Sequence, residues 1–327
     1  MKPFIQIKDE HGRTFKTLRV SLTSLCNFGC VYCVNSEDKG GINELNTNAL
    51  SHLDYNELAE LVIQLHKTLQ FESVRLTGGE PMLYQNLIPF IQILKSSGIK
   101  NVKMTTNGYN LKQKAEGLAA AGVKDINISL DAVDPEIFKV IARRNFHKQV
   151  TEGIEAAIKN GIFVKLNSVI MRGLNQNQVL PLLEYAMSKK IGLRYLELMR
   201  MGHFYSKNFN EYFFPMDDIL SVINTKYPIA PSDYRNPSAT ARIFQLENGY
   251  EFGIIANESE PFCSDCDRLR LDSSGNIYGC LSEEKSEYIA DIAGDEIKLS
   301  EKLLEALKHK QPLKFKGSPL KMISIGG

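Results

Sequence analysis

The six cysteines of this chain fall into two groups of three, and their spacing is the first feature that suggests chemistry. Three lie together in a short loop and three lie near the carboxyl end: Cys26, Cys30 and Cys33, then Cys263, Cys266 and Cys280. In a chain that carries no recognisable secretion signal, such groups predict metal centres and not disulfides.

The first group identifies the kind of metal centre more closely. A structural zinc site takes four protein ligands, and most iron–sulfur clusters are held by four cysteines. Three cysteines on a cubane cluster leave one iron open to a small molecule. The Cys-x3-Cys-x2-Cys loop, with Tyr32 directly before its last cysteine, resembles the radical S-adenosylmethionine superfamily, whose open iron chelates that cofactor. Zinc with a distant fourth ligand, or buried cysteines without a metal, are the alternatives that the residues leave open.

A glycine pair marks a second candidate binding loop. Gly78, Gly79 and Glu80 follow an expected strand at 73–77, and parallel α/β sheets place ligands at the carboxyl ends of their strands. Glycines there would let the backbone approach a bound carboxylate or amine, although a tight turn is the alternative. Downstream of the cysteine loop, this segment resembles the Gly-Gly-Glu-Pro motif with which the superfamily binds the methionyl amine. The resemblance adds Ser129 and Met199 as cofactor contacts.

Two arginines follow the second cysteine group. Arg268 and Arg270 alternate on a probable strand, so both guanidiniums point to one face. Paired guanidiniums bind a phosphate chain through bidentate, charge-assisted hydrogen bonds. A solvated charged face on an edge strand is the alternative.

Alternating strand and helix patterns must position these residues. Strands are expected at 18–22, 73–77, 102–106, 125–130, 162–170 and 193–198, and helices from 54 onward and near 85–97, 110–121, 148–160 and 176–188. Asp54 and Glu57 resemble a capping box that opens the first of these helices. Six such units predict an α/β fold with a parallel sheet, an incomplete (β/α)6 barrel. A polar segment at 35–48 is expected to form a lid.

The pattern changes after residue 235. Hairpins are expected at 243–255 and 268–280, followed by a helix at 298–308. We therefore expect a barrel domain over residues 1–235 and a carboxy-terminal extension over residues 236–327 that carries the second cysteine group.

Composition narrows the class of partner. Of 327 residues, 43% are hydrophobic and 24% charged, and the formal net charge is +1. These values favour neither nucleic acid nor an anionic membrane as a partner. The amino terminus becomes charged too early for a signal peptide, and no apolar run reaches the roughly 20 residues that span a bilayer. A cytoplasmic location is expected.

Taken together, the two cysteine groups, the Arg268-Leu-Arg270 segment and the terminal Gly-Gly resemble the molybdenum-cofactor biosynthesis protein A family, the GTP 3',8-cyclases. The similarity covers essentially the whole chain. It implies a radical S-adenosylmethionine lyase with two 4Fe–4S clusters that performs the first step of molybdopterin synthesis. A 5'-deoxyadenosyl radical would take hydrogen from C3' of GTP, and the new radical would attack C8 of guanine. The product is (8S)-3',8-cyclo-7,8-dihydroguanosine 5'-triphosphate.

The same resemblance assigns roles to individual residues. All six cysteines would bind the two clusters. S-adenosylmethionine would contact Tyr32, Gly78, Gly79, Glu80, Ser129 and Met199. GTP would contact Arg19, Arg75, Thr105, Lys165, Arg268 and Arg270, of which Arg19, Arg268 and Arg270 are the catalytic candidates. Ser73 stands where some members have a phosphate-binding lysine, and the Gly-Gly tail would enter the active site.

Partners follow from the resemblance as well. An electron donor such as flavodoxin or ferredoxin, the downstream cyclic pyranopterin monophosphate synthase and a homodimer are implied. Two other readings stay open: a paralogue acting on another nucleotide or a peptide, and a non-catalytic iron–sulfur or zinc protein. Peptide-maturing relatives usually carry more carboxy-terminal cysteines than the three found in this chain.

Overall fold

Every strand in the described part of the chain belongs to a single twelve-stranded sheet. The structure is a computed structural model that describes residues 7–35, 53–231 and 240–322. The strand order is β12-β11-β10-β1-β2-β3-β4-β5-β6-β9-β8-β7. Strands β1 to β6 lie side by side in sequence order, and each pairs in parallel with the next. The expected incomplete (β/α)6 barrel with a carboxy-terminal extension is confirmed.

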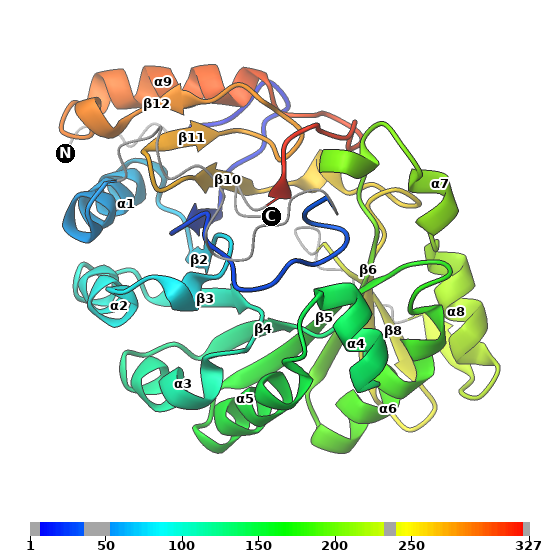
Figure 1. Ribbon diagram of the computed structural model, residues 1–327. Helices are drawn as coiled ribbons and strands as arrows, with labels where there is room; N and C mark the ends of the chain where they lie inside the picture. The colour runs from blue at the N-terminus through cyan, green and yellow to red at the C-terminus, as the bar shows by residue number, and fades with distance from the viewer. Residues whose placement is uncertain (1–6, 36–52, 232–239, 323–327) are drawn as a thin grey trace.

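The barrel elements lie close to their expected positions. Its strands are β1 (Thr17–Ser21), β2 (Ser73–Thr77), β3 (Asn101–Thr106), β4 (Asp125–Ser129), β5 (Phe163–Ile170) and β6 (Gly192–Glu197). Its helices are α1 (Tyr55–Leu69), α2 (Leu87–Ser96), α3 (Leu111–Ala120), α4 (Pro135–Ala142), α5 (His147–Lys159), α6 (Val179–Lys189), α7 (Phe209–Tyr212) and α8 (Met216–Asn224). Figure 1 shows α1, α2, α3, α5 and α6 along the outer side of the curved sheet.

Local sequence explains where α1 begins and which face it buries. Asp54 caps it by accepting hydrogen bonds from the backbone of Asn56 and Glu57, and the Glu57 carboxylate accepts one from Asp54 N at 2.8 Å. This reciprocal pair is the predicted capping box. Its apolar stripe, which includes Leu58 and Leu65, is fully buried against the sheet.

Helix α4 was not expected from the sequence, although its start signal is present. Asp134 accepts hydrogen bonds from Glu136 N at 2.8 Å and Ile137 N at 3.0 Å, and Pro135 occupies the first helical position. Both features are typical of a helix amino terminus. The helix is eight residues long and buries Phe138, Ile141 and Ala142 on one face.

The carboxy-terminal region extends the sheet at both edges. Its elements are β7 (Ile229–Pro231), β8 (Arg242–Leu246), β9 (Glu251–Ile255), β10 (Arg268–Leu271), β11 (Asn276–Tyr278), β12 (Glu287–Tyr288) and α9 (Glu296–Lys308). Both expected hairpins form, as the antiparallel pairs β8–β9 and β10–β11. Strand β9 joins β6 and strand β10 joins β1, each in parallel. Because the sheet continues into both added edges, the boundary near residue 235 stays a prediction.

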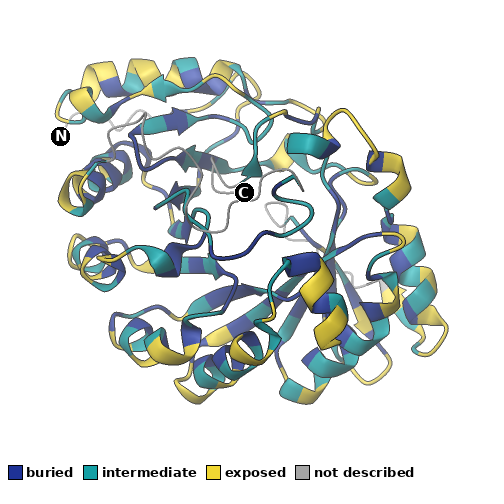
Figure 2. Ribbon diagram, in the orientation of Figure 1, coloured by how far each residue is buried: buried dark blue, intermediate teal, exposed yellow. Residues whose placement is uncertain are grey.

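The two faces of the sheet differ in chemistry. Residues such as Leu18 and Val20 are buried beneath the helices, whereas alternate residues such as Arg19 point to the concave side. Figure 2 shows burial concentrated along the strands and exposure on the outer helix surfaces. No helix in residues 7–35, 53–231 and 240–322 is long and apolar enough to cross a membrane. Most of the expected lid, residues 36–48, lies outside the described residues.

Close packing of α9 on the extension gives a first prediction. A Cβ atom at Gly279 would lie 2.1 Å from the carbonyl oxygen of Ala306 in α9. Gly279→Ala should therefore push α9 away and lower the free energy of unfolding by about 1–3 kcal/mol. Gly294→Ala is the control, because nothing lies within 4 Å of its Cβ position. Urea unfolding followed by circular dichroism measures both, and equal midpoints would contradict the predicted contact.

Candidate functional site

The first cysteine group lies in a loop at the carboxyl end of β1. Cys26, Cys30 and Cys33 line one cavity together with Tyr32. Two arginines that follow α4 hold this loop from outside. Arg143 Nη1 donates to the carbonyls of Val34 at 3.3 Å and Asn35 at 3.0 Å, and Arg144 Nε donates to Asn27 O at 3.1 Å. These hydrogen bonds fix the backbone of the loop that carries the three thiols.

The glycine pair packs directly against this cysteine loop. A Cβ at Gly78 would lie 2.5 Å from Thr23 O, and one at Gly79 would lie 2.2 Å from Leu25 O. Gly79 N donates to Thr23 O at 2.7 Å, so this amide is engaged within the protein. Both glycines line the same cavity as the cysteines. Their absent side chains allow the cysteine loop to approach closely, and their approach to a bound carboxylate or amine stays a prediction.

Glu80 is directed inward and not toward the cavity. Its carboxylate accepts hydrogen bonds from Met82 N at 3.0 Å, Thr106 Oγ1 at 2.6 Å and Asn107 N at 2.6 Å. Burial raises the pKa of Glu80 to about 7, although these hydrogen bonds act to lower it. Glu80 therefore ties the ends of β2 and β3 together, and its direct contact with a cofactor stays a prediction.

Other expected residues also reach the cavity. Ser129 and Thr105 line it, as does Met322 from the carboxy-terminal segment. Tyr32 donates from its hydroxyl to Asp131 Oδ2 at 2.9 Å, which fixes the ring beside the cysteines. Asp131, which sequence reasoning missed, lies two residues beyond β4. Met199 follows the end of β6 but is absent from the described residues that line this cavity.

The second cysteine group lies at the opposite end of the sheet. Cys263 and Cys266 precede β10, and Cys280 follows β11, which is antiparallel to β10. Because β10 runs parallel to β1, with Thr17 opposite Arg268, this group lies at the amino end of β1. The first group lies beyond the carboxyl end of β1. The concave face of the sheet therefore separates the two groups.

The thiols of both groups fit cluster ligands. All six cysteines are free of disulfides. Burial raises the pKa of Cys26 to about 12, and burial with the neighbouring thiols raises that of Cys263 to about 11. Burial also acts to raise the pKa of Cys266, but Lys310 and Arg268 lower it to about 7. A thiol whose pKa is raised by burial keeps its proton until a bound metal replaces that proton, which is the behaviour of a metal ligand.

The spacing of the thiols bears on the type of centre. Among the described residues, no three His, Cys, Asp or Glu side chains converge as the ligands of a single metal ion would. In a cubane cluster each thiolate binds a different iron, so its sulfurs lie farther apart than those around one zinc ion. Two three-thiol sets in separate loops are compatible with such clusters.

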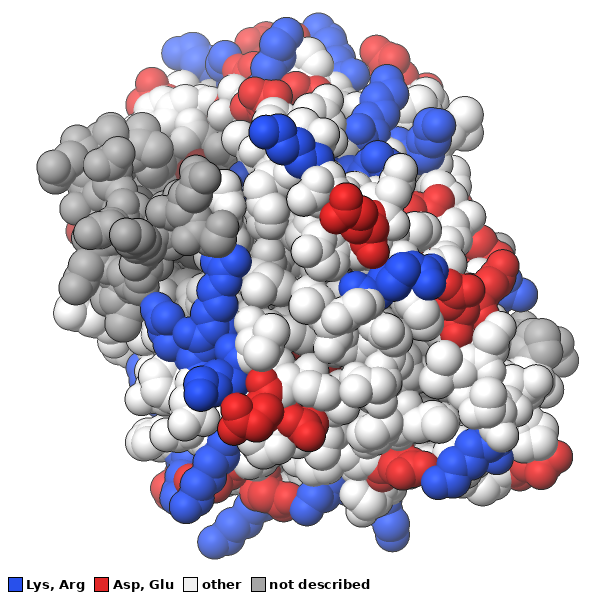
Figure 3. Space-filling view, turned by 45° about the vertical axis from the view of Figure 1, so that its right-hand side comes forward, with Lys and Arg blue, Asp and Glu red and all other residues white. Residues whose placement is uncertain are grey.

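Basic side chains form rows across the concave face between the two groups. Arg270, Arg19, Arg75 and Lys103 lie in register on β10, β1, β2 and β3. Burial lowers the pKa of Arg19 well below its ordinary value, and repulsion from Arg270, Arg75, Arg268 and Arg194 lowers it further. On the face that Figure 3 shows, basic and acidic side chains are interspersed. The row on β10, β1, β2 and β3, in contrast, is basic throughout.

Strands β4 to β6 add Lys165 and two residues that sequence reasoning missed, Asp125 and Arg194. The Asp125 carboxylate forms ion pairs with Lys165 Nζ at 3.2 Å and with Arg75 Nη2 at 3.8 Å. Arg194 Nη2 is buried and has no hydrogen-bond partner among the described residues. A signal was available, because Arg194 alternates with buried Leu193 and Tyr195 on its strand.

Glycines leave room for these long side chains. A Cβ at Gly192 would lie 2.8 Å from Lys165 Cγ, and one at Gly253 would lie 3.1 Å from Arg194 Cγ. Each glycine sits opposite the basic residue in the strand register. The two glycines therefore leave space for the side chains of Lys165 and Arg194 on the concave face, with Asp125 as a nearby carboxylate. A surface rich in such cations suits the binding of a polyanion in a dry site.

Comparisons with known proteins agree with this geometry. Residues 20–186 match the family model of the radical SAM superfamily, and residues 191–315 match that of molybdenum cofactor synthesis C. A GTP 3',8-cyclase from Campylobacter fetus is 37% identical over 308 residues, which are 92% of this chain and 92% of that protein. One from Staphylococcus epidermidis is 37% identical over 279 residues, or 84% of this chain and 81% of its own.

Solved structures resemble the chain in fold. Streptococcus suis SuiB bound to S-adenosylmethionine matches with a TM-score of 0.62 and 14% identity, over 90% of this chain and 68% of that one. Native anSMEcpe with bound AdoMet matches with a TM-score of 0.56 and 16% identity, over 90% of this chain and 83% of that one. At this identity the likeness shows a shared fold alone.

The ion pair of Asp125 with Lys165 gives a pH prediction. Burial lowers the pKa of Lys165, and the Asp125 carboxylate opposes that effect. Asp125→Asn removes the opposing charge, so Lys165 should lose its proton at a lower pH. Because the charged ammonium binds anions, binding of inorganic tripolyphosphate should fall at a lower pH in the variant than in the parent.

Calorimetry on anaerobic protein across the alkaline range would measure this shift. Asp291→Asn is the matched control, since Asp291 is exposed and lies away from the basic rows. If tripolyphosphate binding falls at the same alkaline pH in Asp125→Asn and in the parent, Asp125 does not keep Lys165 protonated.

Proposed function

Because the chain belongs to the radical SAM superfamily and, within it, to the GTP 3',8-cyclase family, we propose that it converts GTP to (8S)-3',8-cyclo-7,8-dihydroguanosine 5'-triphosphate. This is the first step of molybdenum cofactor biosynthesis. The reaction would make the enzyme a lyase.

One observation supports this substrate above others. Two cysteine groups lie at opposite ends of one sheet, and basic rows line the face between them. A nucleoside triphosphate has matching parts: a base with donor and acceptor edges, a ribose, and a polyanionic chain. Its phosphates would lie against the arginines, its ribose toward the first group and its guanine toward the second.

A 4Fe–4S cluster held by Cys26, Cys30 and Cys33 would supply, when bound, the electron for reductive cleavage of S-adenosylmethionine. The residues of the chain would bind and orient S-adenosylmethionine. Tyr32 is held by Asp131, and Ser129 and Thr105 line the cavity where the cofactor would lie. Glu80 holds the glycine loop to the end of β3 through Thr106 and Asn107. Its backbone amide donates to Leu25 O at 2.8 Å, which keeps the glycine loop in contact with the cysteine loop.

The residue roles are part of the proposal. Contacts to S-adenosylmethionine are assigned to Tyr32, Gly78, Gly79, Ser129 and Met199, with Glu80 holding the loop. Contacts to GTP are assigned to Arg19, Arg75, Thr105, Lys165, Arg194, Arg268 and Arg270. A second 4Fe–4S cluster on Cys263, Cys266 and Cys280 would bind the guanine edge. Ser73, which stands where some family members have a phosphate-binding lysine, contacts Thr17, with 3.4 Å between their hydroxyl oxygens.

Further parts of the proposal concern the cell and the chain ends. We propose that the protein is cytoplasmic and that it forms a homodimer. An electron carrier such as flavodoxin or ferredoxin would serve as its reductant. The Gly-Gly tail lies outside the described residues. Met322, just before it, lines the cofactor cavity, which supports entry of the tail into the active site.

The two cysteine groups should have separable roles. Replacing Cys26, Cys30 or Cys33 with Ala should abolish formation of 5'-deoxyadenosine, because the thiolates that hold the reducing cluster are lost. Replacing Cys263, Cys266 or Cys280 should preserve much of that cleavage and stop cyclisation. Anaerobic incubation with S-adenosylmethionine, dithionite and GTP, followed by mass analysis, measures both products. Normal cyclisation by the second set of variants would refute the assignment of that group to substrate binding.

Arg194 gives a test of phosphate binding. Arg194→Met should weaken GTP binding by about 1.5–3 kcal/mol, the usual effect of losing a charged hydrogen bond. Guanosine, which has no phosphates, should bind the variant and the parent about equally. Arg242→Met is the control, because Arg242 pairs with Glu260 on the surface. Equal losses for GTP and guanosine in calorimetry would indicate a structural role for Arg194.

A further inference from the structure

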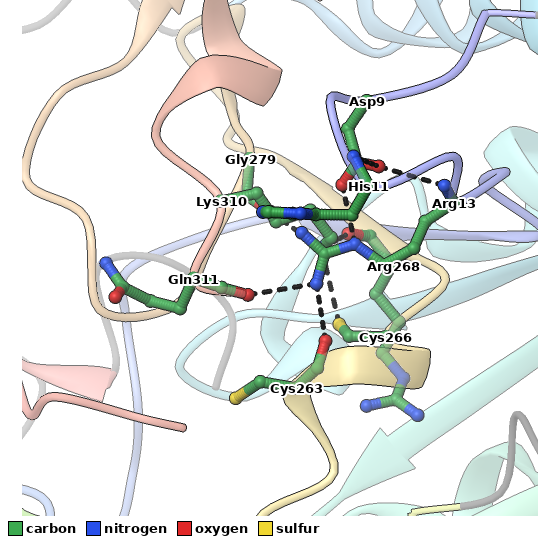
Figure 4. A network of polar contacts seen from close by, with 9 residues as sticks. All are labelled: Asp9, His11, Arg13, Cys263, Cys266, Arg268, Gly279, Lys310 and Gln311. Carbon is green, nitrogen blue, oxygen red and sulfur yellow. Dashed lines mark hydrogen bonds and ion pairs between the residues drawn. The ribbon is translucent and has the colours of Figure 1, made fainter. Parts of the chain in front are cut away.

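A buried lysine lies against the second cysteine group. Lys310 follows α9 and is 5% exposed. Figure 4 shows its side chain directed toward Cys266 and the strands beside it. A buried ammonium is costly unless its N–H groups find acceptors, so its surroundings indicate its role.

All three N–H groups of Lys310 have acceptors. Nζ lies 3.3 Å from Cys266 Sγ, 2.9 Å from Arg268 O and 3.1 Å from Gly279 O. Arg268 follows Cys266 by two residues, and Gly279 directly precedes Cys280. One cation therefore ties together both strands of the hairpin that carries these cysteines, and contacts one of the thiols directly.

Arg13 links Cys263, the remaining cysteine of the second group, to the segment that carries Lys310. Its Nη1 donates to Cys263 O at 2.5 Å and to Gln311 O at 2.9 Å. Asp9 orients the guanidinium through an ion pair with Arg13 Nε at 2.5 Å. Figure 4 shows these groups converging from the amino-terminal turn, the cysteine loop and the segment after α9. Three distant stretches of sequence thus meet around one thiol group.

The two cysteine groups receive different hydrogen-bond donors. Cys26 Sγ has Phe28 N at 3.4 Å and Asn107 Nδ2 at 3.9 Å, which are neutral amides. Cys266 has a buried ammonium. A hydrogen bond from a cation withdraws charge from a metal-bound thiolate and favours the reduced state of the centre. Cys266 therefore has a charged donor in direct contact with its thiol, whereas the donors to Cys26 are neutral.

We propose that Lys310 is a positioning residue that donates to the Cys266 thiolate, braces the second cysteine group with the help of Asp9 and Arg13, and makes the second metal centre easier to reduce. This inference rests on the proposed second cluster. It concerns how that centre is held and tuned, which is separate from whether it binds guanine.

The test is a potentiometric titration followed by electron paramagnetic resonance on the anaerobic full chain. Lys310→Met keeps most of the side-chain volume and removes the charge. The second centre should become harder to reduce. At a fixed potential its reduced-to-oxidised ratio should fall about tenfold, a shift of about 59 mV for one electron, while the first centre should keep its potential. Signals are assigned with the variant that lacks Cys26, Cys30 and Cys33.

Lys308→Met is the matched control, since Lys308 lies two residues earlier and pairs with Glu305 on the surface. An intact second centre with an unchanged potential in Lys310→Met would overturn the inference and leave the proposed function standing. A parent protein with about four irons and not about eight would overturn both.

If Lys310→Met loses the second metal centre, its potential cannot be measured. Amide hydrogen exchange is then compared between the metal-free parent and the metal-free variant. Faster exchange confined to peptides covering 263–271 and 276–280, with α1 to α6 unchanged, is the expected result. Unchanged exchange, or faster exchange throughout the barrel, would show that Lys310 does not brace this group specifically.

Discussion

The parallel pairing of β1 with β10 is the constraint on which the rest of the site depends. It joins strands from the two ends of the chain and places Arg270 beside Arg19 in one row. It also fixes the direction of β10, so the second cysteine group lies at the amino end of β1 while the first follows its carboxyl end. Without this pairing the two groups would have no defined relation, and the arginines would lie on an open edge.

Positive charge inside the sheet is the main energetic cost of this arrangement. Burial of the guanidinium, and then repulsion from the neighbouring arginines, lower the pKa of Arg19. Asp125 offsets part of that repulsion by pairing with Arg75 and Lys165. The apolar layer between strands and helices, with residues such as Leu18 and Val20 fully buried, stabilises the fold enough to sustain it. A bound polyanion would remove the remaining repulsion.

The two cysteine groups are built differently although both contain three thiols. The first sits in a loop fixed by backbone packing against Gly78 and Gly79, with neutral donors around Cys26. The second is held by buried cations, Lys310 and Arg13, that arrive from outside its own segment.

The sequence by itself determined the features that depend on short spacings. These are the cysteine triads, the glycine loop, the capping box at Asp54 and the alternating strands that predict the barrel, since each is set by residues within one element or one loop. Only the tertiary structure decided which strand joins each edge, that the two triads lie at opposite ends, and that Arg194, Asp125 and Lys310 face the site. Strand register and the meeting of Lys310 with Cys266 depend on the packing of residues far apart in sequence, and one chain's local patterns carry no record of that packing.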